Sequence, residues 1–106
     1  MPRTRGFQVV ALPNIDRLLL KSMLGMLEPH LSAHWFETAL APTVIFADSD
    51  HTEGFQVLNE ATKRGVCAVA ITNRPVSPWT YMLRRPVQTR DVLTVLNKIE
   101  IGRAHV

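Results

Sequence analysis

The residues of this chain that could carry chemistry stand directly after apolar runs. In VIFADSD, residues 44 to 50, four apolar residues lead into Asp48, as expected where a buried strand delivers a carboxylate to the edge of a sheet. Nearer the C-terminus, Arg84 and Arg85 precede a proline, and two such guanidinium groups at a sheet edge could contact an anion. Asp48 is therefore either a working acid or a carboxylate that only caps a helix or a loop.

Other catalytic and metal-binding patterns are missing from the sequence. It has no glycine-rich phosphate loop, no CxxC or HExxH spacing and no GxSxG motif. His30, His34 and His51 lack the spacing of metal ligands. Cys67 is the only cysteine and lies within an apolar run, which predicts a buried, inert thiol. We therefore expect no enzyme activity, no metal and no cofactor.

Length and composition predict one globular domain in the cytoplasm. The chain has 106 residues, of which 46% are hydrophobic and 20% charged. Its net charge of +3 is well below that of the dense basic surfaces that bind nucleic acids. The longest apolar segment, residues 15 to 27, contains Asp16, Arg17 and Lys21 and is too short to span a bilayer. Neither a membrane nor a nucleic acid is an expected partner.

The C-terminal segment IGRAHV, residues 101 to 106, corresponds to one reading frame of a widely used sequencing adapter (ATC GGA AGA GCA CAC GT). We expect this tail to be non-native and the domain to cover residues 1–100. The natural protein would then continue past Glu100. An output domain would lie in that missing part.

Apolar periodicity and turn residues predict alternating strands and helices. The predicted strands are residues 7–12, 31–36, 43–47, 66–72 and 80–83. The predicted helices are residues 15–28, 49–65 and 89–99. Their candidate N-cap residues are Asn14 for the first, Ser49, Asp50 or Thr52 for the second, and Thr89 for the third. Pro75 and Pro78 forbid a regular helix before the last strand.

Two segments leave questions open. The connection at residues 37–42 is too short for a helical crossover, so either it is unusual or the strands on either side are antiparallel. In the first helix Leu20 and Leu24 lie off the expected inner stripe, which leaves apolar surface for a partner, a second layer or self-association. The members of that stripe are Ile15, Leu18, Leu19, Met23, Met26 and Leu27.

The order of elements and the strand ends resemble the receiver domains of two-component response regulators over about residues 7–99. Asp48 stands where that family has its phosphoryl-accepting aspartate. Thr72 matches the serine or threonine that ends the fourth strand, and Arg85-Pro86 stands at the lysine-proline pair. The resemblance implies a single three-layer α/β domain of the flavodoxin type, with about five strands and about three helices. Two of the family's helices would be missing.

The departures from the family pattern bear on activity. Receivers have an acidic pair after the first strand that helps to hold magnesium, but this chain has Leu12-Pro13-Asn14 there. Asp16 is the nearest substitute, and we expect it to point along the first helical turn. Arg85 replaces a compact ammonium with a broad planar group, which could instead hold Asp48 in a bidentate ion pair.

The sequence therefore predicts a non-catalytic receiver-like signalling or interaction domain, independent of phosphorylation, at the N-terminus of a longer bacterial regulatory protein. Asp48 would be an inactive phosphoacceptor-like position, and Thr72 and Arg85 switch-like positions. The partner would be another protein or the output domain, with Arg84 and an exposed Trp79 as candidate contacts. A homodimer is left open.

Two alternatives stay open. The first is a domain that binds a small molecule or nucleotide and uses Arg84 and Arg85 to hold phosphate. The second is a true phosphoacceptor whose metal site is rearranged. Thr72 could also be an ordinary β-branched strand residue with no role in a switch.

Overall fold

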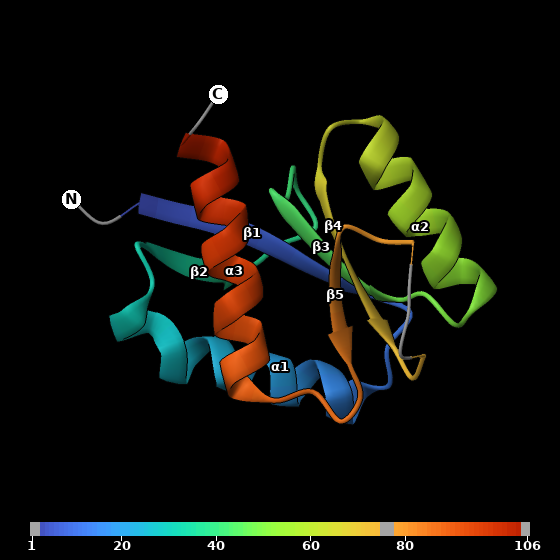
Figure 1. Ribbon diagram of the computed structural model, residues 1–106, viewed down its shortest axis with the longest axis horizontal. Coiled ribbons are helices and arrows are strands. Elements are labelled where there is room, and N and C mark those ends of the chain that lie inside the picture. Colours follow the sequence, from blue (N-terminus) through green and yellow to red (C-terminus); the bar gives the residue numbers. More distant parts are fainter. Residues whose placement is uncertain (1–2, 75–77, 105–106) are drawn as a thin grey trace.

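The computed structural model describes residues 3–74 and 78–104, and it is an α/β fold with one parallel sheet (Figure 1). The five strands are β1 (Arg3–Val10), β2 (Ala33–Glu37), β3 (Val44–Asp48), β4 (Cys67–Thr72) and β5 (Tyr81–Arg84). They are all parallel and lie in the order β2-β1-β3-β4-β5, the flavodoxin-type order. The predicted fold class is confirmed.

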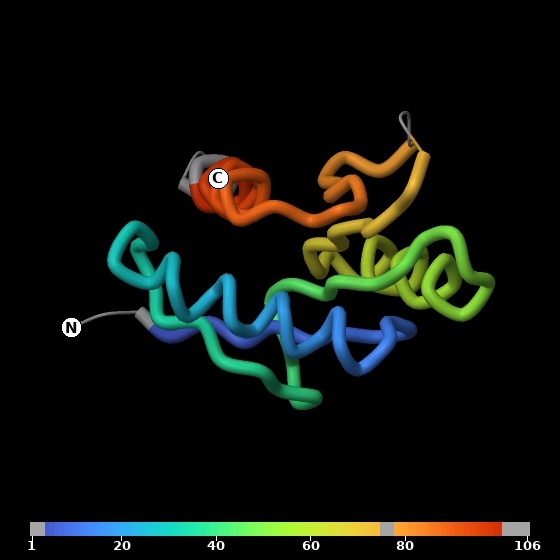
Figure 2. Tube along the Cα trace, turned by 90° about the horizontal axis from the view of Figure 1, so that it is seen from below, coloured from blue at the N-terminus to red at the C-terminus, as the bar shows by residue number. Residues whose placement is uncertain are grey.

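Helices cover both faces of the sheet and make the fold three layers thick. The helices are α1 (Asn14–Leu27), the short 3-10 helix η1 (Glu28–His30), α2 (Thr52–Lys63) and α3 (Thr89–Ala104). Side chains of α1 and α3 share one core with the sheet, while those of α2 pack on the opposite face. Figure 2 shows α3 nearly end-on, with α1 running across the view.

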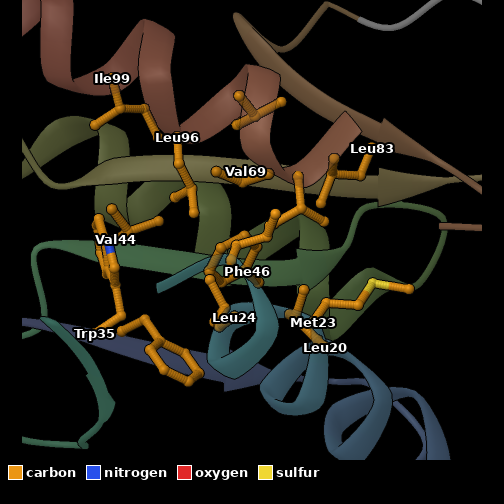
Figure 3. Close-up of a cluster of buried hydrophobic side chains, with 14 of the residues drawn as sticks. Leu20, Met23, Leu24, Trp35, Val44, Phe46, Val69, Leu83, Leu96 and Ile99 are labelled. Carbon is orange, nitrogen blue, oxygen red and sulfur yellow. The ribbon is translucent and has the colours of Figure 1, made fainter. Parts of the chain in front are cut away.

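The larger core lies between the sheet and the pair α1 and α3 (Figure 3). Phe46 is fully buried at its centre and meets Phe7 edge-on, with ring centroids 6.1 Å apart. Leu20 and Leu24 reach it from α1, and Leu96 reaches it from α3. Each such buried side chain contributes about 1.5–3 kcal/mol of transfer free energy, so this core fixes both helices on the sheet.

The short connection between β2 and β3 has a geometrical explanation. β2 pairs with β1 only as far as Phe7, and β3 begins its pairing with β1 at that same residue, on the other side of the strand. Because β2 ends where β3 starts, the chain needs only to cross β1, and no return along the sheet is required. Of the two predicted possibilities, the strands are parallel and the connection is the unusual part.

Gly6 is the residue that lets this connection cross β1 closely. Thr43 donates its hydroxyl to the Gly6 carbonyl oxygen over 3.1 Å, and a Cβ on Gly6 would overlap the Thr38 side chain. Gly6 lies on the same face of β1 as Val10, which packs in the core beneath α2. The connection therefore runs over the face where a flavodoxin-type fold would carry another helix.

The buried face of α1 differs from the predicted stripe. Met23 and Leu27 are buried as expected, but Leu20 and Leu24, which the prediction placed off the stripe, are buried too. Four predicted stripe members are at least half exposed, namely Ile15, Leu18, Leu19 and Met26. The predicted stripe is therefore wrong by part of a turn, because leucines occupy every side of this helix.

Most element ends agree with the predictions within a few residues, and the helix starts differ. β1 begins at Arg3 and ends at Val10, before the predicted end. Asn14 is the first residue of α1 and not its cap, since the N-cap position is Pro13. His51 takes the corresponding position before α2, and no side chain caps that helix. Thr89, expected as an N-cap, is likewise the first residue of α3.

The described residues between β2 and β3 contain no helix, as the sequence predicts. Between β4 and β5, residues 73, 74 and 78–80 are also irregular, and Pro75 falls outside the described part. None of the helices in the described ranges has the length and apolarity needed to cross a membrane.

A buried ion pair connects β1 to the last turns of α3. Arg5 Nε lies 3.0 Å from Glu100 Oε1, with both side chains less than one-fifth exposed. The Arg5 guanidinium also stands 6.0 Å from the centre of the Trp35 ring, within reach of a cation–π interaction. Glu100, the last residue of the predicted domain, thus takes part in the packed fold.

Candidate functional site

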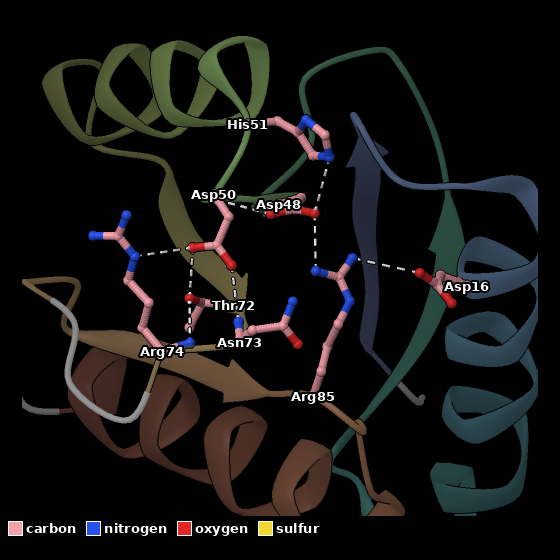
Figure 4. A network of polar contacts seen from close by, with 8 residues as sticks. All are labelled: Asp16, Asp48, Asp50, His51, Thr72, Asn73, Arg74 and Arg85. Carbon is pink, nitrogen blue, oxygen red and sulfur yellow. Dashed lines mark hydrogen bonds and ion pairs between the residues drawn. The ribbon is translucent and has the colours of Figure 1, made fainter.

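The parallel strands bring the predicted site residues to one edge of the sheet (Figure 4). Asp48 ends β3, Thr72 ends β4 and Arg85 directly follows β5, so all three lie at the carboxyl ends of neighbouring strands. Ligands of open α/β sheets bind in the crevice outside these strand ends. The arrangement that the apolar runs predict is therefore present.

Asp48 is buried and already paired. Its side chain is 4% exposed, and Arg85 Nη1 donates to Asp48 Oδ2 over 2.9 Å. The second carboxylate oxygen, Oδ1, accepts the backbone N–H of Asp50 over 2.8 Å. Both oxygens of the Asp48 carboxylate are thus held by donors from the protein.

Asp16 joins the same site, contrary to the expectation that it points along its helical turn. Arg85 Nη2 lies 3.4 Å from Asp16 Oδ2, and Figure 4 shows the Asp16 side chain directed from α1 toward the guanidinium. Arg85 therefore bridges two carboxylates with one nitrogen each. The expected bidentate pair with Asp48 alone is not the geometry found.

Thr72 is bonded to Asp50 and not to Asp48. The Thr72 hydroxyl donates to Asp50 Oδ1 over 2.8 Å, and the backbone N–H of Asn73 donates to Asp50 Oδ2 over 2.9 Å. These two hydrogen bonds hold the pKa of the Asp50 carboxyl below its usual value, and the one from Asn73 has the larger effect. Arg74 adds a contact of 3.7 Å from its Nε to Asp50 Oδ1.

The Asp50 cluster is the part of the site that the sequence did not predict, because Asp50 was expected only as a helix cap. Its carboxylate instead ties the loop before α2 to the end of β4. The one available signal was the pair of aspartates in DSD, where the second carboxylate follows the first within the same turn. That spacing does not reveal which strand end the second carboxylate reaches.

Gly54 sets how closely α2 approaches the site. It lies in the first turn of α2, and a Cβ there would overlap the carbonyl oxygen of Asp48. The glycine thus allows the start of α2 to rest directly on the end of β3. The N-terminal turn of α2 covers the Asp48 backbone as a result.

The residues present do not suit the magnesium ion that the receiver resemblance implies. A hard cation would need the oxygens of Asp48 and Asp16, and the positively charged Arg85 guanidinium lies between these carboxylates. His51 Nε2 stands 3.7 Å from Asp48 Oδ2, but its side chain is largely exposed. Within the described part of the chain, no group of three or more metal-ligating side chains is placed to hold a metal ion.

The two adjacent arginines do not converge on one site. Arg85 faces the carboxylates, whereas Arg84 is exposed on β5.

Trp79 is only partly exposed and meets the Phe55 ring edge-on at a centroid distance of 5.5 Å. It packs against the smaller core under α2, so only part of its indole is accessible to a partner.

No protein-family model, curated protein or solved structure matches this chain. The geometry of the site is therefore the basis for inferring its function.

Proposed function

We propose that this chain is a non-catalytic, receiver-like interaction domain of a bacterial cytoplasmic regulatory protein, and that it acts without phosphorylation. The observation that carries the proposal is the Arg85 guanidinium between Asp48 and Asp16. An internal cation occupies the space next to the carboxylate where phosphoryl transfer would require a metal ion and an incoming phosphoryl group.

The surroundings of Asp48 support a fixed site. A phosphoryl donor would have to displace Arg85 from a carboxylate whose side chain is 4% exposed. The Thr72 hydroxyl, which the family resemblance makes a switch position, is engaged by Asp50 through a 2.8 Å hydrogen bond. Both contacts favour one conformation, so the domain would bind its protein partner or output domain constitutively.

The direct test is intact-mass measurement after incubation with acetyl phosphate, with and without magnesium. We expect no added phosphoryl group on the wild-type chain or on Asp48→Asn, while an active receiver domain in a parallel tube gains one. Circular dichroism would verify that both samples are folded. A magnesium-dependent gain on the wild type that is absent from Asp48→Asn would refute the proposal.

A cellular test addresses signalling. Asp48→Asn keeps an oxygen for Arg85 and should leave both the fold and partner binding intact. A folded Asp48→Asn protein that lost all signalling would count against phosphorylation-independent action.

The alternative of phosphate binding through Arg84 and Arg85 has less support. A phosphate that approached Arg85 would meet the carboxylates of Asp16 and Asp48, which repel it. Thermal unfolding against a panel of nucleotides separates the two hypotheses, since a ligand of the folded state must raise the midpoint. We expect no nucleotide to do so.

A further inference from the structure

A pocket of about 340 Å³ opens beside the Asp16–Arg85 pair. Leu19 and Met23 of α1 form one wall, and Val87, between β5 and α3, forms part of the other. Its volume lies in the range of small-molecule sites, about 300–1,000 Å³, and apolar residues with a few polar groups are the usual lining of such sites. The pocket lies at the carboxyl edge of the sheet, where α/β folds bind their ligands.

Two charged residues, Asp16 and Arg85, line this pocket. Asp48 does not line it but shares the Arg85 guanidinium with Asp16, so the cluster of Asp16, Asp48 and Arg85 has a net charge of −1. Asp48 is enclosed, but the Asp16 side chain is 39% exposed and lines the pocket. Asp16 is therefore the carboxylate that a ligand can reach.

Asp16 also has unused hydrogen-bonding capacity. Its Oδ2 receives only a long contact of 3.4 Å from Arg85, and its Oδ1 accepts no hydrogen bond from any described residue. A carboxylate can accept several donors on its two oxygens. An ammonium group could thus bind Asp16 without displacing Arg85.

We infer that this pocket binds a small primary amine with an apolar body, whose ammonium group donates to Asp16 while its hydrocarbon lies against Leu19, Met23 and Val87. Asn73, which also lines the pocket, offers a side-chain amide whose oxygen could accept a second ammonium hydrogen. An anionic ligand of the same shape is disfavoured, because it would meet the exposed Asp16 carboxylate and the Arg85 guanidinium is already shared between Asp16 and Asp48. This binding activity is separate from the proposed interaction function and does not depend on it.

The test is a titration of the ¹⁵N-labelled full chain, followed by amide chemical shifts, with three ligands of one shape. The ligands are cyclohexylmethylamine, cyclohexylmethanol and cyclohexanecarboxylate at neutral pH. We expect the amine to shift amides of α1 and of residues 85–87, the alcohol to bind about fivefold more weakly, and the carboxylate to leave these amides unchanged.

Three variants make the test specific. Asp16→Asn should bring the amine to the affinity of the alcohol, a loss of about fivefold. Asp91→Asn removes a similarly exposed carboxylate from the first turn of α3 and should leave the amine affinity unchanged. Leu19→Asn, at a half-exposed position, should weaken the binding of the amine and of the alcohol alike.

The inference is overturned if no amine binds up to its solubility limit, or if the amine and the alcohol bind the wild type equally. It is also overturned if the shifted amides lie away from α1 and residues 85–87. If Asp16→Asn does not fold, Leu19→Asn decides: unchanged affinity for both the amine and the alcohol would likewise refute the site.

Discussion

Replacing Arg85 with methionine would leave Asp48 as a buried carboxylate without its cation. The Asp48 side chain is 4% exposed and would keep only the hydrogen bond from the Asp50 amide and the longer contact with His51. Breaking a buried ion pair in this way costs about 3–5 kcal/mol, since the remaining charge is uncompensated. Because Arg85 is itself 21% exposed, we expect the lower value, about 3 kcal/mol, for Arg85→Met.

Asp48→Asn should cost much less, about 1 kcal/mol, because asparagine can still accept a hydrogen bond and Arg85 keeps Asp16. In the double variant the unpaired carboxylate is gone. Its cost should therefore fall about 2 kcal/mol short of the sum of the two single costs. This sign of the coupling identifies Arg85 as the group that compensates Asp48.

The free energies of unfolding can be measured by urea denaturation with linear extrapolation, followed by tryptophan fluorescence, to which the buried Trp35 contributes. Arg84→Met is the matched control, since it removes an exposed guanidinium from the neighbouring position and should change stability by less than about 0.5 kcal/mol. If Arg85→Met cost no more than Arg84→Met, or if the two site substitutions were additive, the reasoning would be refuted.

Two further predictions concern the same edge of the sheet. Gly54→Ala should destabilise the fold by more than about 2 kcal/mol, because the added Cβ would overlap the Asp48 carbonyl. Gly25→Ala, in open space on α1, should stabilise the fold by about 0.5–1 kcal/mol. Urea unfolding of both variants checks this prediction, and equal effects would contradict it. Because folding lowers the pKa of Asp50, its carboxylate stabilises the fold fully at pH values above the unfolded pKa of 3.8. This stabilisation is lost as the pH falls through the folded pKa. The difference in unfolding free energy between the wild type and Asp50→Asn should therefore be constant above about pH 5 and shrink below it. Thr72→Val removes a hydrogen bond to Asp50 and should make that difference smaller. A pH-independent difference would contradict the stabilising role of the Asp50 carboxylate.

The sheet was the most predictable part of the molecule. The runs of residues 44–48 and 67–72 are apolar at nearly every position, and both strands are buried on both faces, as inner parallel strands must be. The stagger of β2 and β3 along β1 could not be predicted. It is a register between distant segments, and register is set by packing and by turn geometry.

The buried face of α1 could not be predicted from periodicity either. Leu18, Leu19 and Leu20 are consecutive and point in three directions around the helix, so hydrophobicity alone does not select one of them. Only Leu20 is buried, since the positions of α3 and β3 decide which side of α1 faces the core. The prediction failed where the sequence offers more apolar residues than one face can hold.

Within the site, the proximity of Asp48 and Arg85 followed from two strand ends, because parallel strands end at one edge. The roles of Asp16 and Asp50 did not follow. Asp16 lies in the first turn of a helix and Asp50 in a turn, where small changes of backbone direction decide which neighbour a side chain reaches. Positions at strand ends are thus predictable from topology, whereas contacts made from turns require the folded geometry.

The proposed independence of phosphorylation can be expressed as the fraction of molecules in which the Asp48–Arg85 pair is open. If opening the Asp48–Arg85 pair costs about 3 kcal/mol, fewer than about one molecule in a hundred presents a free Asp48 carboxylate at any time. A phosphodonor would react only with that fraction, and without a metal ion to neutralise its charge. A partner that binds the surface of the domain meets nearly every molecule in the same paired state. Under this proposal, the same ion pair that disfavours phosphoryl transfer would hold the domain in one conformation for binding.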